Sequence, residues 1–304
     1  MKILRRKYLY ITLVLLSFAG LYAYAPYFVV EMKNPVILTA KHYFHKDVNN
    51  YQTHFPEYAE KIHFKTRDNI ILTATIFKSK KKTAKANIIL LHGIRSSKES
   101  FLPVIDFLTQ NNFNAIALDL RAHGESGGEF CTFGYLEKQD VKRLIDCLIK
   151  TKNLKAPFGI WGHSLGGAIA LQTLATDKNI KFGIIESSYS NFKSITADYS
   201  DYYLGFDMDF LNKNILERSG ELAKFDINKV NPIDYCKKIS QPVLLIHGTD
   251  DKKINIKYAY DNYKALKSYS KYFYKVKGAG HNDVWQKGGQ PLFDKILEFL
   301  QEQK

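Results

Sequence analysis

A serine framed by glycines is the residue of this sequence whose surroundings most clearly suggest chemistry. Ser164 lies in a G-x-S-x-G pattern with Gly162 and Gly166, after the apolar run 158–161 and before an apolar helical pattern that ends near residue 174. A tight strand-to-helix turn of this kind holds a serine in a strained conformation and exposes its hydroxyl. Small residues are needed on both sides because Cβ atoms there would keep the helix away from the strand. We therefore predict that Ser164 is a nucleophile at such a turn.

The same pattern occurs a second time, at 124–128, with Ser126 at its centre. This copy follows polar residues rather than a buried strand, and it runs into Glu129–Cys131 rather than into a helix. A G-x-S-x-G match points to a nucleophile where a strand precedes the serine and a helix follows it. The context therefore favours Ser164 over Ser126.

Alternating strand and helix patterns must position Ser164. A β-hairpin is predicted at Lys61–Thr66 and Ile70–Phe77, and a closing helix at Pro291–Leu300. Between them we expect buried strands at 87–91, 115–118, 158–160, 182–185, 243–246 and 272–276, and helices at 101–110 and 135–150. Strands that alternate with helices indicate an α/β fold with a mostly parallel sheet and helices on both faces.

Ligands of such sheets bind beyond the carboxyl ends of the strands. Residues with nucleophilic or acid–base side chains follow these predicted strands, at His92–Gly93, Asp119, Ser164, Glu186, Asp250–Asp251 and His281. Because the carboxyl ends of parallel strands share one edge of the sheet, we expect these residues to converge on one site.

Five motifs resemble, in the same chain order, those of the α/β-hydrolase superfamily: Leu90–Gly93, Leu118–Ser126, Gly162–Gly167, Pro242–Asp251 and Gly278–Asp283. The resemblance is closest to single-pass, membrane-anchored serine hydrolases of esterase or thioesterase type, and it extends from about residue 61 to the C-terminus. Ala122 stands where this family usually has a glycine, a change that does not touch the chemistry. The resemblance implies an α/β-hydrolase fold with a short helical cap.

The resemblance also implies catalytic roles. Ser164 would be the nucleophile and His281 the general base that takes its proton and returns it to the leaving group. The superfamily has the chain order Ser, acid, His, which places the acid after the strand 243–246. We expect Asp251, three residues past the glycine of the His-Gly pair, with Asp250 as the open alternative. The implied oxyanion donors are the backbone N–H groups of Ile94 and Leu165.

The activity implied is hydrolysis of carboxylic esters or thioesters, including lipid-like acyl substrates, through an acyl-enzyme intermediate. It requires no cofactor and no metal, and we expect a small-molecule acyl substrate and no obligate protein partner. A serine peptidase or aminopeptidase of the same fold is one alternative, although the sequence shows no large extra domain to gate peptides. A catalytically silent binding protein is another, although such proteins normally lack part of the triad.

The segment between residues 187 and 229 leaves the strand–helix rhythm and is rich in aromatic residues. In the family this position holds the cap, which we place at about 188–230. Aromatic residues mainly bury area, so the cap should pack on the sheet. Two interpretations stay open: the same face also lines an apolar acyl pocket, or it only packs on the sheet.

The N-terminus predicts a membrane helix. An uncharged, largely apolar stretch, 8–30, follows a cluster of four basic residues within 2–7, and it is long enough to cross a bilayer. A cleaved signal peptide is the alternative, because Ala23–Ala25 resembles a cleavage site, but Pro26 is poorly tolerated just after a cut. We therefore expect an uncleaved signal anchor at 1–30.

Orientation and domain boundaries follow from the same region. The basic cluster argues that the N-terminus is cytoplasmic and the rest extracytoplasmic, although Lys33, Lys41 and Lys46 weaken the bias. We divide the chain into the anchor at 1–30, a juxtamembrane segment at 31–57 and the hydrolase domain at 58–304. Apolar residues recur at helical spacing over 34–51, which predicts an amphipathic helix on the membrane or on the domain.

Charge and cysteine content limit the partners and cross-links that we expect. The net charge of +14 is spread through lysines. It indicates either a solvated basic surface or a surface attracted to an anionic membrane. We find no nucleic-acid-binding motif, so nucleic acid is not an expected partner. The three cysteines are too few for a disulfide scaffold or a zinc cluster, while one bridge among them stays open.

Overall fold

Six parallel strands form the centre of the molecule. The computed structural model describes residues 2–33, 39, 59–81, 83–155, 157–204 and 209–303. One eight-stranded sheet has the order β1-β2-β4-β3-β5-β6-β7-β8. Strands β3 to β8 are parallel to one another, and β2 pairs antiparallel with both β1 and β4. The strands are β1 (Glu60–Lys65), β2 (Ile71–Phe77), β3 (Ala86–Leu91), β4 (Phe113–Leu118), β5 (Phe158–His163), β6 (Ile180–Glu186), β7 (Val243–Gly248) and β8 (Lys271–Val276).

Continuous apolar runs explain the central strands. Every residue of β3, β4 and β7 is buried, as expected of strands whose two faces are both covered by helices. All the strands predicted from the sequence are present, with ends that differ by at most three residues.

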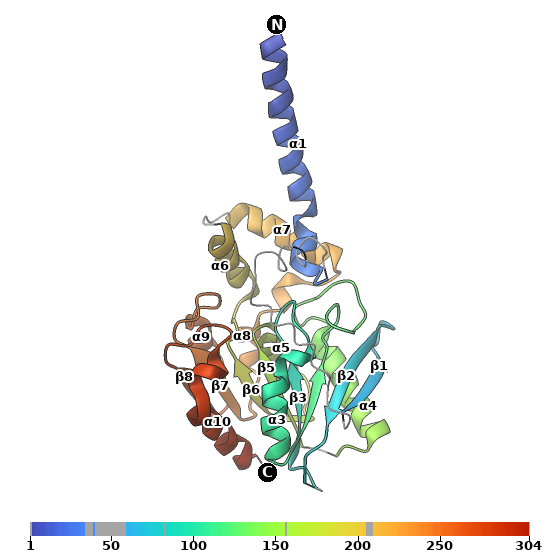
Figure 1. The fold of residues 1–304 in the computed structure, drawn as a ribbon, viewed down its shortest axis with the longest axis vertical. Helices are drawn as coiled ribbons and strands as arrows, with labels where there is room; N and C mark the ends of the chain where they lie inside the picture. The colour runs from blue at the N-terminus through green and yellow to red at the C-terminus, as the bar shows by residue number, and fades with distance from the viewer. Residues whose placement is uncertain are drawn as a thin grey trace.

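Helices cover both faces of this sheet (Figure 1). One core cluster includes buried side chains of α4 and α5, and a second includes those of α3 and α10. The helices are α1 (Lys2–Val30), η1 (Lys98–Phe101), α3 (Leu102–Gln110), α4 (Glu137–Lys152), α5 (Leu165–Leu174), α6 (Phe192–Leu204), α7 (Asp209–Leu222), η2 (Ile227–Lys229), α8 (Pro232–Cys236), α9 (Lys257–Ala265) and α10 (Val284–Glu302). The arrangement is the α/β-hydrolase fold.

The aromatic segment after β6 folds as two helices, α6 and α7, above the sheet (Figure 1). Phe192 and Phe225 pack on Phe133, with ring centroids 4.4 and 6.0 Å from it, and both are buried in the main core. Tyr202, in contrast, is 49% exposed. The buried rings therefore attach the cap to the domain.

Helix α1 projects from the domain beside α7 (Figure 1). Its segment Tyr10–Val30 is long and apolar enough to cross a membrane, a property that signal sequences share. The predicted amphipathic helix over 34–51 lies outside the described residues.

Helices α8, α9 and α10 differ from expectation, and the five-residue α8 was not predicted. Helix α9 was not predicted, because its nine residues are mostly polar and only three of them are buried. Helix α10 begins at Val284 rather than at Pro291, and Gly289, with φ of 51°, interrupts it just before the proline. The expected N-terminal proline thus begins the second, longer part of this helix. All three cysteines are free.

Candidate active site

Ser164 lies at a sharp turn between β5 and α5. Its backbone has φ of 56° and ψ of −118°, a conformation that residues with a Cβ rarely adopt. A Cβ on Gly162 would lie 2.1 Å from the carbonyl oxygen of Gly166, and one on Gly166 would lie 1.9 Å from that of Leu91. Glycine is therefore sterically required on both sides of Ser164, as the sequence pattern indicated.

His281, in the loop after β8, lies between Ser164 and Asp251. Its Nε2 is 3.1 Å from Ser164 Oγ, and its Nδ1 is 2.8 Å from Asp251 Oδ2. Because a carboxylate only accepts, the Nδ1–H donates to Asp251, which leaves Nε2 free to accept from the serine hydroxyl. The structure thus brings together the three side chains for which the sequence suggested catalytic roles.

Asp251 is the carboxylate beside His281, and Asp250 is not. Asp251 is buried, and its Oδ1 accepts from the backbone N–H groups of Lys253 and Ile254, each at 2.9 Å. Asp250 is exposed and accepts from the neighbouring Thr249 hydroxyl at 2.7 Å. Only one of the two alternatives is therefore placed to orient the imidazole.

A second histidine, His247 near the end of β7, also contacts the Asp251 carboxylate. His247 Nε2 lies 2.8 Å from the carbonyl oxygen of Ile254 and 3.3 Å from Asp251 Oδ2. Burial by itself would raise the pKa of Asp251, but hydrogen bonds from His247 and His281 outweigh burial and hold this pKa well below its ordinary value. Asp251 is therefore an anion at neutral pH.

The environment of His281 keeps its ring neutral. Burial lowers the pKa of His281 below its ordinary value of 6.5, although the hydrogen bond to Asp251 works in the opposite direction. The ring of His163, whose centroid is 5.0 Å away, also lowers this pKa. A neutral imidazole is the form able to accept a proton from Ser164.

Two backbone segments flank Ser164 where an oxyanion would form. A Cβ on Gly93 would lie 3.4 Å from Ser164 Cβ, so the loop that continues to Ile94 runs directly beside the serine. Leu165 is the first residue of α5, and the N–H of a first helical residue has no acceptor within its own helix. These positions suit the two suggested donors, and their role stays a prediction.

Glu186 forms a hydrogen-bonded centre for which the sequence suggested no role. Its Oε2 accepts from the indole N–H of Trp285 at 2.7 Å and from that of Trp161 at 3.2 Å. Its Oε1 lies 3.1 Å from His163 Nδ1. The position of Glu186 at the carboxyl end of a strand was the one available signal, because its three partners lie at least 23 residues away from it in the chain.

Asp119 and Ser126 have structural partners. The buried Asp119 carboxylate lies 2.6 Å from the ammonium of Lys98 and accepts from the N–H groups of Lys98 and Glu125. Ser126 Oγ donates to the Asp119 carbonyl at 2.6 Å and accepts from the N–H of Thr73 at 2.9 Å. Ser126, the serine of the second G-x-S-x-G pattern, thus connects its own loop to Asp119 and to Thr73 on β2.

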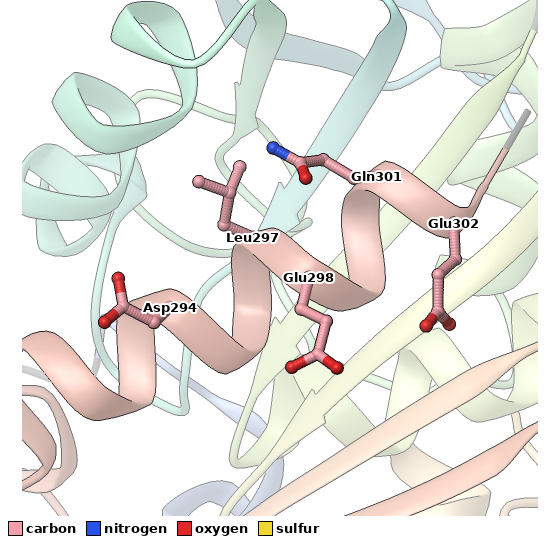
Figure 2. Close-up of a pocket in the computed structure, with 5 residues that line it drawn as sticks. All are labelled: Asp294, Leu297, Glu298, Gln301 and Glu302. Atoms are coloured by element: carbon pink, nitrogen blue, oxygen red, sulfur yellow. The ribbon is translucent and has the colours of Figure 1, made fainter.

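A shallow hollow on α10 lies away from this site. Figure 2 shows the five side chains that line it, Asp294, Leu297, Glu298, Gln301 and Glu302. They belong to the C-terminal half of α10, at the end of the domain opposite α6 and α7 (Figure 1). Within the described ranges, no three His, Cys, Asp or Glu side chains are grouped as a metal site.

Several known proteins are similar to this chain in sequence. Residues 82–192 match the family model described as serine aminopeptidase, S33. The uncharacterized protein YqkD of Bacillus subtilis is 27% identical over 222 residues, which cover 70% of each chain. Dipeptidyl peptidase 4 of Trichophyton equinum is 28% identical over 149 residues, which cover 47% of this chain but 18% of that protein.

A solved esterase structure matches more of the chain. The esterase from Pyrococcus furiosus superposes with a TM-score of 0.67 at 25% identity, over 81% of this chain and 91% of that one. The fold, the matched family model and this esterase structure together support the membership of this chain in the α/β-hydrolase superfamily.

Proposed function

We propose that this protein is a serine hydrolase that cleaves carboxylic esters or thioesters through an acyl-enzyme intermediate. The observation that carries the proposal is the continuous chain of contacts from Ser164 Oγ to His281 and from His281 to Asp251. It joins a hydroxyl, a neutral imidazole and an anionic carboxylate in the order that nucleophilic acyl transfer requires.

In the first half of the reaction, Ser164 Oγ bonds to the acyl carbon while its proton passes to His281 Nε2. The carbonyl oxygen becomes an oxyanion, for which we assign the N–H groups of Ile94 and Leu165 as donors. When the tetrahedral centre collapses, His281 gives the proton to the leaving alcohol or thiol. Asp251 stays ionised throughout and stabilises the imidazolium that forms.

In the second half, water attacks the acyl-enzyme and passes a proton to His281. Collapse of the second tetrahedral intermediate releases the acid and returns the proton to Ser164. The chain of contacts therefore supports both halves with the same three side chains.

The share of each known protein that this chain matches favours ester substrates over peptides. The esterase structure is matched over most of both chains, whereas the dipeptidyl peptidase is matched over 18% of its length. The description of the family model keeps an aminopeptidase as the second candidate. Parallel assays on p-nitrophenyl esters, acyl thioesters and peptide anilides separate these activities.

We also propose that α1 anchors the protein in a membrane, with the N-terminus cytoplasmic and the domain extracytoplasmic. Side chains of α1 such as Leu15, Leu16 and Phe18 are 63–66% exposed, which suits contact with lipid rather than with water. The carbonyls of Tyr22 and Ala23, which cleavage after Ala25 would remove, accept hydrogen bonds from Arg218, and this supports retention of the segment. Cysteine accessibility at either end of α1 tests the orientation.

A fluorophosphonate probe tests the nucleophile. Labelling should map to the peptide that contains Ser164 and should disappear in Ser164→Ala. The matched control is Ser126→Ala, which removes the serine of the other G-x-S-x-G pattern and should still be labelled when circular dichroism shows that it is folded. A folded wild-type protein that takes up no label would refute the proposed function.

A further inference from the structure

The end of α1 is built into the hydrolase domain. Val30 and Met32 are 0% and 2% exposed within the main core. The N–H of Cys131 donates to the carbonyl of Val30 at 2.9 Å, and the ammonium of Lys33 donates to the carbonyl of Ser126 at 2.9 Å. The helix is therefore held by the domain over its last turns and is not attached through a free linker at this point.

The cap contributes a specific contact to α1. Pro26 has no N–H, so the carbonyl of Tyr22, four residues earlier, has no helical donor. The guanidinium of Arg218 in α7 donates to this carbonyl at 2.9 Å and to that of Ala23 at 3.1 Å. It also lies 4.7 Å from the centre of the Tyr22 ring. The carbonyl that Pro26 leaves without a helical donor is thus bound by the cap, which fixes the orientation of α1 on it.

Other contacts of α1 are with loops on the edge of the sheet that carries the candidate site. Arg95, which follows Ile94 after β3, donates to the carbonyl of Phe28. Phe130, after β4, packs on Tyr27 with ring centroids 6.3 Å apart. Strands β3 to β8 are parallel, so these loops leave the same edge as Ser164, Asp251 and His281. Helix α1 accordingly leaves the domain on the side of the active site.

The length of α1 then limits how far this edge can stand from a membrane. The apolar part that is not docked, 8–21, is about 20 Å long at ~1.5 Å per residue. A hydrocarbon core is about 30 Å thick. A helix this short cannot span the core unless the docked turns also enter the interface. Tyr22 and Tyr24, 39% and 38% exposed, are residues that favour that depth, and Arg218 can reach the headgroups from there.

We propose that the docked end of α1 holds the sheet edge that carries the candidate site against the bilayer, and that the substrate is an acyl ester or thioester of the adjoining leaflet. The proposal rests on the proposed hydrolase function and on the anchoring role of α1. It assigns α6 and α7 to the membrane surface, with the acyl chain entering from the lipid rather than from bulk water.

Fluorescence quenching by brominated lipids tests the orientation without any assay of activity. Tryptophan is introduced by Tyr202→Trp on α6 or by Tyr269→Trp before β8, at the amino edge of the sheet, where Tyr269 is 107% exposed. In full-length protein reconstituted in phosphatidylcholine vesicles, brominated chains should quench the first probe above the background of the native tryptophans and leave the second unchanged. Equal quenching of both probes, or quenching of the second alone, would overturn the proposal.

Arg218→Ala tests whether docking matters for the reaction. This variant should lose activity several-fold on a long-chain ester embedded in vesicles and keep its activity on a water-soluble short-chain ester. Lys213→Ala, which removes a charge from an exposed position of the same helix, should retain both activities. Equal losses on the two substrates, or no loss on either, would overturn the proposal. A wild-type protein that cleaves neither ester refutes the proposed function instead, and the quenching experiment still reports the orientation.

Discussion

Glu186 and Trp285 are joined by a hydrogen bond of 2.7 Å from the indole N–H to the carboxylate. Trp285 follows His281 by four residues, and the same carboxylate binds Trp161 and lies beside His163, both on β5. The loop that carries the candidate base is therefore tied to the strand that ends at the candidate nucleophile. We therefore predict that Glu186 positions the loop of His281.

Replacement of Glu186 by glutamine should weaken this tie. An amide can accept through one atom only, so one indole or imidazole donor loses its partner, at a cost of about 1 to 3 kcal/mol in unfolding free energy. Misplacement of His281 should lower kcat several-fold with little change in KM. Denaturant melts and steady-state kinetics measure both effects. The control is Glu298→Gln on the exposed surface of α10, and a Glu186 variant that behaves like it would contradict the positioning role.

The two neighbouring aspartates should differ sharply. Asp251→Asn removes the acceptor that fixes the His281 tautomer, and comparable changes lower kcat about ten-thousand-fold. Asp250→Asn should stay within a few-fold of wild type, because Asp250 is exposed and bonds to Thr249. Ester hydrolysis by the two purified variants provides the measurement. A larger loss at Asp250 would reverse the assignment of the acid.

Activity should depend on pH through a group that must be unprotonated. His281 accepts the serine proton only when neutral, and burial lowers its pKa below 6.5. The value of kcat/KM should therefore rise with pH, with a midpoint below 6.5, and reach a plateau near neutrality. A pH–rate profile with a soluble ester reports this midpoint. A midpoint well above neutrality would show that His281 is not the base or that its surroundings differ.

Buried His92 should make the fold sensitive to acid. Its ring accepts from the N–H of Leu120 at 3.1 Å, and burial lowers its pKa from 6.5 to about 4. The unfolded state therefore binds the proton more readily, so stability is full above about pH 6.5 and is lost as the pH falls toward 4. The contribution of this shift is about 3 kcal/mol.

Urea titrations at several pH values measure that dependence. His92→Asn should flatten the decline between pH 6.5 and 4. His63→Asn, at an exposed position on β1, is the matched control and should leave the slope as in wild type. Equal slopes in all three proteins would exclude His92 as a source of the effect.

The docked turns of α1 should stabilise the domain even without lipid. A fragment 22–304 keeps Val30 and Met32, whereas a fragment 34–304 removes both of these buried side chains. Burial of each contributes about 1.5 to 3 kcal/mol, so the shorter fragment should unfold at clearly lower urea concentration. Melts of the two fragments in the same detergent measure the difference. Identical melts would mean that the contacts of α1 add nothing to the fold.

Much of the architecture was predictable because it depends on local patterns. Buried runs such as 87–91 and 243–246 fix strands, and the glycines around Ser164 are required by a turn whose sterics involve near neighbours. The order of these strands along one edge then brings His281 and Asp251 to the serine. Their catalytic roles stay predictions.

The parts that were not predictable depend on contacts between distant residues. Nothing near Glu186 in sequence indicates that Trp161 and Trp285 will share its carboxylate. Nothing near Pro26 indicates that Arg218 will bind the carbonyl of Tyr22, since no periodic pattern links them. The choice between Asp250 and Asp251 likewise needed the path of the loop, because both residues have the same chemistry.

The hydrogen bond between Arg218 and Tyr22 can form only late in synthesis of the chain. It joins residues 196 positions apart, and the partner on α1 is made first. At about 5 to 20 residues per second, roughly 10 to 40 s pass between translation of the two. Throughout that interval the last turns of α1 have no cap to bind. The ribosome must complete more than two-thirds of the chain before the helix that is made first can be seated.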